Sequence, residues 1–512
     1  MTRIRTLIGV SLAAVLTGVA LPTSASSAAP GLYEAETAVV RQAVVESDHT
    51  GFTGTGYVDY ANAVGSSVEF TVHAATAGRA DLVLRYANGT AVDRPMDVTV
   101  NGAVVADQQS FPGTGSWTSW RTVTVSALLA AGTDTVRATA TTAGGGPNLD
   151  SLTVGTPAAA TDWSAALVRS TTTRYTPSSI GGWSYQVGLY LYGQYLVYQR
   201  THDPALLAYI RSWVDRFVTS SGGISQSFDS LDSMMAGRLL VIMHHETGQT
   251  KYATAAKKIM DRLTGYPRTS DGGFWHATTS SRAHQLWGDG TYMLTPFLVE
   301  YGREFNDAPA ADDEATKQLV VYASHLQLPS GILRHAYDES RTASWADPTT
   351  GQSPESWCRA VGWYGMATVT VLDAVPADSP RRAQLLVILR NLAAGLERYQ
   401  DPASGRWFQV MDKGSRADDW TETSCSSMFA YTLSRAAQQG YVDAHYAAVA
   451  QRGYQGVLAR ISLGGDGLTD LTGISIGTNV GDYAYYVGRT RATNDLHGLG
   501  SFLIMNEQLE KP

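Results

Sequence analysis

Clustered positive charge is absent from this sequence of 512 residues. The chain has 38 basic against 46 acidic residues, which gives a formal net charge of −8. No basic stretch is longer than a pair of residues, so the continuous basic surface that binds nucleic acid is excluded. Charged residues of both signs make up only 16% of the chain.

Cysteine is almost absent, with only Cys358 and Cys425. A chain with so few cysteines depends on its core rather than on disulfides. Two interpretations of the pair stay open: one disulfide in an oxidising compartment, or two buried thiols that pack as small apolar groups. The pair has no CxxC spacing and residues 244–246 (His-His-Glu) lack the HExxH spacing, so a zinc site is excluded.

Long apolar runs are missing beyond the N-terminus. The one long run spans 7–21, follows Arg3 and Arg5, and precedes the small-residue stretch 22–28. This order is typical of a secretory signal peptide, so we expect residues 1–29 to be removed and the protein to be secreted. No other apolar stretch reaches about 18 residues, so no membrane domain is expected.

Aromatic residues, in contrast, are plentiful: the chain has 26 Tyr, 12 Trp and 11 Phe beside 50 Gly. With 44% apolar residues it is too apolar for a disordered chain, and it is too long for one ordinary domain. Many aromatic rings in a chain of low charge suit sites that stack on flat neutral faces, sugar rings among them.

The chain changes character near residue 160. Before it, short alternating runs bounded by turn residues lie at 67–72, 81–86, 96–100 and 135–139. They indicate an antiparallel, jelly-roll-like β-sandwich over 31–155, followed by a linker at 156–162.

Beyond the linker, apolar residues recur at helical spacing, and residues 163–512 are predicted to be all-α. Twelve stretches pair into six hairpins, which predicts an (α/α)6 toroid; they lie near 183–200, 204–219, 231–247, 251–264, 288–305, 312–326, 358–373, 380–399, 424–438, 442–459, 482–489 and 495–508. Trp and polar residues gather at the starts of the odd-numbered stretches. We expect these starts to meet at one end of the toroid, where helix N-termini favour an anionic ligand.

Asp289 is the first candidate for acid–base chemistry. It lies between two glycines and two residues after Trp287, so a ligand has room beside it. We expect the apolar wall to raise its pKa, as a general acid near neutral pH requires. The alternative is a helix-starting aspartate without a catalytic role. Asp232 is the second candidate carboxylate, and Asp229 competes for its role.

Three further polar residues have two interpretations each. His276 and His335 lie on glycine-rich loops, where a histidine is more often part of the hydrogen-bonded structure than of a site. Arg359 lies between Trp357 and Trp363 and is a candidate clamp for a carboxylate between aromatic faces. The alternative is a surface arginine that extends along its helix.

From about residue 163 to 510 the chain resembles glycoside hydrolase family 105, the unsaturated rhamnogalacturonyl hydrolases. The resemblance rests on the order of several motifs: Trp183-Ser184-Tyr185, Leu231-Asp232-Ser233, Trp275-His276, Trp287-Gly288-Asp289-Gly290, Trp357-Cys358-Arg359, Trp407-Phe408-Gln409, Glu422-Thr423-Ser424 and Asn494-Asp495-Leu496-His497. Gly288, Thr291 and Val361 depart from the commonest family residues near the expected acid, so we expect an altered subsite for the sugar beyond the cleaved bond.

The resemblance implies an (α/α)6 toroid that removes a terminal 4,5-unsaturated galacturonyl residue from oligosaccharides that a lyase makes from rhamnogalacturonan or pectin. An aspartate of the family protonates C4 and activates the water that adds to C5. By position, the resemblance implies that Asp289 is this general acid/base and Asp232 an assisting carboxylate. It also implies catalysis without metal or cofactor, and substrate contacts at Tyr185, His276, Trp287, His335, Trp357, Arg359 and Trp363.

Residues 31–155 resemble a family 35 carbohydrate-binding module. The motifs that carry this resemblance are Tyr33-Glu34-Ala35-Glu36, Gly54-Thr55-Gly56-Tyr57, Trp117 with Trp120, and Pro147-Asn148-Leu149-Asp150. The resemblance implies a structural calcium held by Glu34, Glu36 and Asp150, and ligand contacts at Trp117 and Asn148. The implied partner is a plant or algal polysaccharide, and a sandwich without a ligand is the alternative.

Other functions stay open. One keeps the fold and changes the sugar to an unsaturated glucuronyl group from ulvan, arabinogalactan or glycosaminoglycan lyase products. A second is an ordinary glycosidase for saturated glucuronides. A third, of another class, is a non-catalytic glycan-binding protein, against which the presence of both Asp232 and Asp289 argues. The oligomeric state stays open as well.

Overall fold

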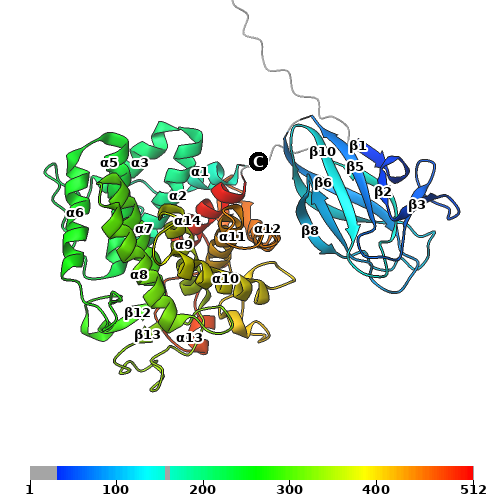
Figure 1. The fold of residues 1–512 in the computed structure, drawn as a ribbon. Coiled ribbons are helices and arrows are strands. Elements are labelled where there is room, and N and C mark those ends of the chain that lie inside the picture. Colours follow the sequence, from blue (N-terminus) through cyan, green and yellow to red (C-terminus); the bar gives the residue numbers. More distant parts are fainter. Residues whose placement is uncertain (1–30, 76, 156–161, 511–512) are drawn as a thin grey trace, which may run out of the picture. The chain divides into compact units, whose positions relative to one another are not determined.

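The computed structural model describes residues 31–75, 77–155 and 162–510, which form a β unit followed by a helical unit (Figure 1). The predicted signal peptide, residues 1–29, and most of the predicted linker lie outside the described residues. Among the helices that the structure describes, none is long and apolar enough to span a membrane.

The β unit is a sandwich of two sheets, as predicted. One sheet has the order β3-β4-β11-β6-β9, with β1 also paired to β11, and the other has the order β2-β5-β10-β7-β8. Neighbours such as β5 and β10 run antiparallel. The strands are β1 (Gly31–Glu34), β2 (Val39–Arg41), β3 (Ala43–Glu46), β4 (Tyr57–Tyr60), β5 (Ser67–Ala74), β6 (Gly78–Ala87), β7 (Met96–Val100), β8 (Ala103–Gln109), β9 (Arg121–Leu129), β10 (Gly132–Ala140) and β11 (Asn148–Val154).

Alternation along the strands separates the core of the sandwich from its surface. In β10, Val136, Ala138 and Ala140 are buried, and the residues between them are partly exposed. Because successive side chains of a strand point to opposite faces, this pattern buries one face of the strand. The one-turn helix η1 (Ala35–Thr37) connects β1 to β2.

The helical unit is the predicted (α/α)6 toroid. Within residues 162–510, an inner ring consists of α2 (Tyr185–Thr201), α5 (Gly237–Thr247) with the one-turn α4 (Leu231–Met234) before it, α7 (Asp289–Glu304), α9 (Cys358–Ala374), α11 (Thr423–Gln438) and α14 (Leu496–Leu509). Each inner helix packs on the next, and α14 closes the ring on α2. The outer helices are α1 (Trp163–Arg174), α3 (Pro204–Val214), α6 (Thr250–Thr264), α8 (Ala308–Leu326), α10 (Arg382–Arg398) and α12 (Tyr446–Leu458).

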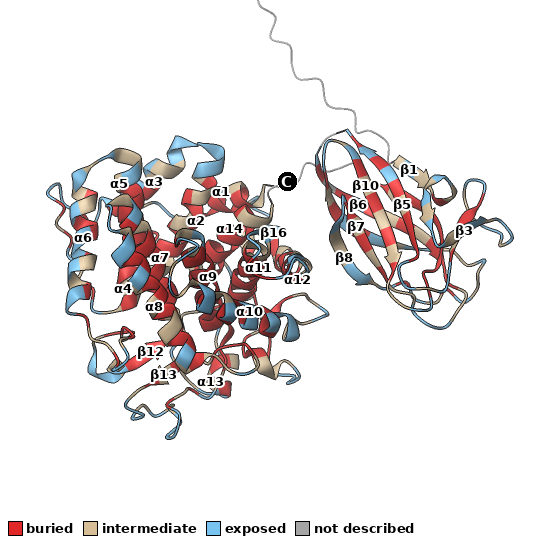
Figure 2. Ribbon diagram, in the orientation of Figure 1, coloured by how far each residue is buried: buried red, intermediate tan, exposed pale blue. Residues whose placement is uncertain are grey.

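Burial distinguishes the two rings (Figure 2). The outer helix α6 buries residues at three- and four-residue spacing, among them Tyr252, Ala256, Ile259 and Leu263. This single stripe faces the inner ring. The inner helix α9 is buried from Cys358 to Val369 without interruption, because it is covered on all sides.

Two details of the predicted helices are wrong. The stretch near 482–489 is the five-residue helix α13 (Tyr483–Val487), which is not part of the inner ring, so α14 is an inner helix and its outer partner is α1. The apolar pattern did not predict α1, because its serines and threonines leave no clear apolar stripe. Several of these hydroxyls donate to carbonyl oxygens four residues earlier. In addition, the stretch 231–247 is divided between α4 and α5.

Short strand pairs and single turns order the loops. They are β12 (Gln285–Trp287) with β13 (Ala336–Asp338), β14 (Trp407–Phe408) with β15 (Thr421–Glu422), β16 (Ile461–Leu463) with β17 (Thr469–Leu471), β18 (Ile474–Ser475) with β19 (Arg491–Ala492), and the turns η2 (Ser280–Arg282) and η3 (Met411–Lys413). Three inner helices, α7, α11 and α14, begin within four residues of such a strand.

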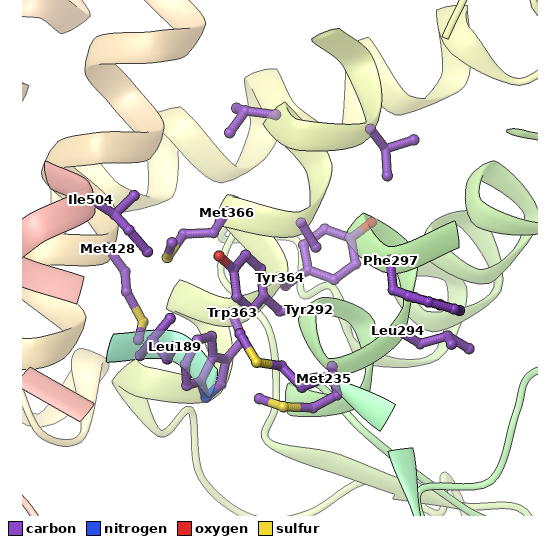
Figure 3. Packing of buried hydrophobic residues seen from close by; sticks show 14 of the residues in the cluster. Leu189, Met235, Tyr292, Leu294, Phe297, Trp363, Tyr364, Met366, Met428 and Ile504 are labelled. Atoms are coloured by element: carbon purple, nitrogen blue, oxygen red, sulfur yellow. The ribbon is translucent and has the colours of Figure 1, made fainter. Parts of the chain in front are cut away.

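Side chains fill the interior of the ring (Figure 3). Trp363 is fully buried and stacks on Tyr292 with the ring centroids 5.0 Å apart. Met235 and Met428 belong to the same apolar cluster. This packed interior contacts the first turns of the inner helices, since Trp363 also lies against Tyr185 at the start of α2.

Candidate active site

The inner helices bring one polar residue each to a common site. Tyr185 and Asp289 are the first residues of α2 and α7; Asp232, Arg359, Ser424 and His497 are the second residues of α4, α9, α11 and α14. The charges of Asp232, Arg359 and Asp289 all act on the Tyr185 hydroxyl, so these groups lie near one another. The first turns of the inner helices therefore gather at one site, as predicted. Aligned helix N-termini favour negative charge there.

Asp289 begins α7 directly after β12, whose pairing with β13 orders this loop. Its side chain is 14% exposed, and its Oδ2 atom lies 3.1 Å from Nε2 of His335, which is fully buried. The N–H of Gly288 donates to the carbonyl oxygen of His335 at 2.8 Å. Side-chain and backbone contacts thus hold this carboxylate and this histidine together.

The expectation that an apolar wall raises the pKa of Asp289 is wrong. Burial by itself pushes this pKa upward, but the hydrogen bond from His335 and the nearby imidazole of His276 outweigh it and hold the pKa below its ordinary value. The site without ligand therefore contains an ionised Asp289. A ligand that carries negative charge and displaces water would move this pKa back upward.

Asp232 forms a second carboxylate–histidine pair. Its Oδ2 lies 3.5 Å from Nε2 of His276, which is almost fully buried. The ring of His276 stacks on Trp287, with centroids 4.5 Å apart and planes 5° from parallel. Asp229, the competing carboxylate, is 54% exposed and pairs with Arg262 at 3.1 Å. Asp232 is therefore the carboxylate that belongs to the site.

The tryptophans occupy different depths. Trp287 is 5% exposed and has the guanidinium of Arg282 over its ring at 4.4 Å. Trp357 is buried against His335, with ring centroids 4.7 Å apart, and its indole N–H has no acceptor among the described residues. Trp363, predicted as a direct substrate contact, lies below the site, where its ring touches Tyr185 from the packed interior. It supports Tyr185 and is not exposed to a ligand.

Arg359 is buried and already has protein partners. Its guanidinium donates to the carbonyl oxygens of Ser475 at 2.5 Å and Ile476 at 2.8 Å, and to Oγ of Ser424 at 3.3 Å. The side chain therefore anchors residues 475–476 beside the site. A bound carboxylate would share the guanidinium with these carbonyls.

Cys358 and Cys425 form a disulfide with their Cα atoms 5.7 Å apart. Of the two interpretations that the sequence left open, the structure therefore has the bridge. The bridge joins the first turns of α9 and α11, directly beside Arg359 and Ser424. It keeps two of the helix starts that form the site at a fixed separation.

Three side chains of the site received no role from the sequence. The Tyr185 hydroxyl lies 2.9 Å from Nε2 of His497, and the Tyr486 hydroxyl lies 2.6 Å from Nδ1 of His335. Arg282, stacked on Trp287, is the third. The motif around His497 was visible as part of the resemblance, whereas Tyr486 stands beside two other tyrosines, Tyr483 and Tyr485, and carries no distinguishing pattern.

In the β unit, the predicted calcium ligands surround the loop at Thr53. Oγ1 of Thr53 lies 2.8 Å from Oε2 of Glu34 and 2.9 Å from Oδ2 of Asp150, and the N–H of Thr55 donates to Oε1 of Glu36 at 2.6 Å. Oε2 of Glu36 is buried without a partner among the described residues. Burial and the charges of the other two carboxylates raise the pKa of Glu34. These features fit a cation with oxygen ligands.

The predicted ligand contacts of the β unit lie in different surroundings. Trp117 is half-buried and stacks on His49 with centroids 6.2 Å apart, and the guanidinium of Arg94 lies 5.3 Å from its ring. Asn148 is 2% exposed, and its Oδ1 has no partner among the residues described. Trp117 is therefore partly exposed beside His49 and Arg94, while Asn148 offers a single buried oxygen.

Known proteins match both units. A family model described as Glycosyl Hydrolase Family 88 matches residues 163–511, and one described as Carbohydrate binding module (family 35) matches residues 31–155. A solved structure of a C. acetobutylicum glycoside hydrolase from family 105 is 32% identical, with a TM-score of 0.65, over 68% of this chain and 99% of that one. These matches confirm the family resemblances and the fold class predicted from the sequence.

Curated relatives match parts of the chain. The exo-beta-D-glucosaminidase of Amycolatopsis orientalis is 52% identical over 122 residues, 24% of this chain and 12% of that enzyme. Protein Atu3128 of Agrobacterium fabrum is 36% identical over 226 residues, 41% of this chain and 96% of that protein. The chain thus spans only a small part of the first of these relatives.

Proposed function

The chain belongs to glycosyl hydrolase family 88 and carries a family 35 carbohydrate-binding module, and from this premise we propose its substrate. We propose that it removes a terminal 4,5-unsaturated galacturonyl residue from lyase-made rhamnogalacturonan or pectin oligosaccharides. The observation that carries the proposal is the pair Asp289–His335, a buried acid–base group at the N-terminal ends of the inner helices. Such a site suits a small acidic sugar with a reactive double bond.

The proposed reaction is the hydration of a vinyl ether. Asp289, protonated once the acidic substrate has displaced water, gives its proton to C4, and a water molecule adds to C5 as Asp289 takes the proton of that water. The product is a hemiketal at C5, whose ring opens and releases the remaining oligosaccharide. The net change consumes one water molecule, and one carboxyl group performs both proton transfers.

The other residues of the site bind and orient in this proposal. Asp232, held by His276, accepts a hydrogen bond from a sugar hydroxyl and assists Asp289. Arg359 and the helix N-termini attract the uronate, and Trp287 and Trp357 form apolar walls. His335 keeps Asp289 in place.

A panel of lyase products tests this proposal. Consumption of the double bond removes its ultraviolet absorbance, so turnover is followed directly with unsaturated galacturonyl and unsaturated glucuronyl oligosaccharides. We expect turnover of the galacturonyl substrates, loss of at least about a thousandfold in kcat in Asp289→Asn, and wild-type activity in the surface control Asp229→Asn. If only glucuronyl substrates are turned over, the substrate is an unsaturated glucuronyl oligosaccharide instead. If no member of the panel is turned over, the protein is a non-catalytic glycan-binding protein.

The β unit is proposed to hold the enzyme near plant or algal polysaccharide. In it, Glu34, Glu36 and Asp150 would bind calcium through carboxylate oxygens, and Trp117 would offer its face to a sugar ring while Asn148 accepts a hydrogen bond. Arg85 already forms an ion pair with Asp150, so calcium would share this carboxylate with an arginine.

We also propose that the protein is secreted. The N-terminal pattern supports this, and the disulfide between Cys358 and Cys425 suits an oxidising compartment. Expression in a secreting host tests the proposal, since the protein is expected in the medium with a new N-terminus between residues 25 and 30. Retention of the full-length chain in the cell would contradict it.

A further inference from the structure

Tyr486 connects to the proposed acid–base group without reaching the substrate side. It is a fully buried residue of α13 and stacks on Trp357 with centroids 5.9 Å apart. Its hydroxyl oxygen lies 2.6 Å from Nδ1 of His335 and accepts a hydrogen bond from the N–H of Gly481 at 3.0 Å. On its other side, His335 contacts Oδ2 of Asp289 through Nε2 at 3.1 Å. The three side chains form a line from a buried phenol to a carboxylate.

Only one placement of protons gives every polar group in this line a hydrogen-bond partner. Oδ2 of the ionised Asp289 only accepts, so Nε2 of His335 must carry a proton. Gly481 already donates to the Tyr486 oxygen, and the phenol has one proton of its own, which needs an acceptor because the group is buried. Unprotonated Nδ1 of His335 is that acceptor. A proton on Nδ1 instead would leave the phenol proton without a partner.

Burial favours the same state. It lowers the pKa of His335, although the hydrogen bond and charge of Asp289 act in the opposite direction. Besides Tyr486, the charged and titratable groups that act on His335 are Asp289 of α7, His276 of the loop after α6, and Arg359 of α9. A neutral imidazole with its single proton on Nε2 satisfies every partner in the line.

We infer that Tyr486 is a positioning residue whose O–H fixes the Nε2–H tautomer of His335 and thereby directs the catalytic proton of Asp289 to Oδ1. Because Oδ2 accepts the imidazole N–H, a proton that Asp289 acquires goes to its other oxygen. The inference rests on the proposed function for its catalytic consequence, since Oδ1 is then the atom that delivers the proton to C4. The tautomer itself follows from the contacts alone.

Tyr486→Phe removes the hydroxyl and keeps the ring that stacks on Trp357. Without the phenol proton, Nδ1 of His335 is free to take up a second proton, and the imidazolium so formed stabilises the Asp289 carboxylate. We expect kcat near neutral pH to fall at least about tenfold and the alkaline limb of its pH profile to move to lower pH by about one unit. KM should stay within about twofold, because the hydroxyl does not contact the substrate.

Two further variants separate this role from a structural one. Tyr483→Phe removes a hydroxyl from the same helix that donates to Asp418 at 2.7 Å, and it should leave the pH profile unchanged. In a His335→Gln background, where no tautomer exists, Tyr486→Phe should have no additional effect on kcat. Equal losses of kcat in both backgrounds, or a pH profile of Tyr486→Phe that superimposes on the wild type, would overturn the inference.

Nitrogen NMR on histidine-labelled protein reads the tautomer without any substrate. The His335 signals, identified by their disappearance in His335→Gln, should show a proton on Nε2 and none on Nδ1 at neutral pH. A proton on Nδ1 in the wild type would overturn the inference whatever the enzyme hydrolyses. An inactive wild type with the Nε2–H tautomer would instead contradict the proposed function and leave the assignment of protons intact.

Discussion

The hydroxyl of Tyr185 lies 2.9 Å from Nε2 of His497, and Nδ1 of the same histidine lies 2.6 Å from Oδ1 of Asp495. The carboxylate requires the imidazole proton on Nδ1, so Nε2 is an acceptor and Tyr185 donates to it. The Tyr185 oxygen therefore presents only lone pairs to a ligand. A sugar hydroxyl fits this oxygen, and a carboxylate does not.

Removal of the Tyr185 hydroxyl should weaken substrate binding more than it affects folding. In Tyr185→Phe, we expect KM for the unsaturated oligosaccharide to rise about tenfold, as for the loss of one hydrogen bond in a buried site, and the free energy of unfolding to fall by about 1 kcal/mol. Steady-state kinetics and urea unfolding measure the two effects. The control is Tyr195→Phe. Tyr195 lies on α2 like Tyr185, but its hydroxyl donates to Glu246 of α5, so its removal should leave KM unchanged. An unchanged KM in Tyr185→Phe would contradict the proposed contact.

Arg359 should matter for acidic substrates in particular. Arg359→Lys keeps the positive charge but loses the planar fork that holds residues 475–476, so we expect KM to rise about tenfold, and Arg359→Ala about a hundredfold. The surface variant Arg262→Ala is the matched control and should behave as wild type. If KM is the same in Arg359→Ala as in the wild type, Arg359 does not hold the uronate.

The disulfide should stabilise the helical unit. For its sequence separation of 67 residues, the chain-entropy description gives about 4 kcal/mol of unfolding free energy at 25 °C. We expect the double variant Cys358→Ala with Cys425→Ala to lose up to this amount in urea unfolding, and a reductant to destabilise only the wild type. Equal effects of the reductant on both proteins would show that the bridge does not form in solution.

Calcium should stabilise the β unit of the full-length protein. At a concentration about a hundred times its dissociation constant, a ligand specific for the folded state adds about 2.7 kcal/mol. We expect a chelator to lower the melting temperature of the β unit and Glu36→Gln to abolish the response to added calcium. The control Glu69→Gln breaks only the ion pair with Arg137 in the same unit, and it should keep the response to added calcium. A wild type that is insensitive to calcium and chelator would contradict the metal site.

The order of elements was predictable because it depends on local patterns. Alternation indicated the sandwich, and helical spacing indicated the toroid, including the residues at the helix starts. α1 was missed since its buried surface includes hydroxyls that hydrogen-bond within the helix, which hides the apolar stripe. The break between α4 and α5 was missed for a related reason: the apolar pattern continues through Met235 and Ala236.

The residues available for chemistry could be recognised from the sequence alone: Asp289 and Asp232 at helix starts, tryptophans beside them, and Arg359 between aromatic residues. How these groups behave depends on contacts between distant parts of the chain. The pKa of Asp289 is lowered because His335, 46 residues later, reaches it with an N–H, and Asp232 is chosen over Asp229 because only Asp232 faces a histidine of the site. Proton positions depend on partners brought together by folding, such as Tyr486 and His335, which are 151 residues apart in sequence.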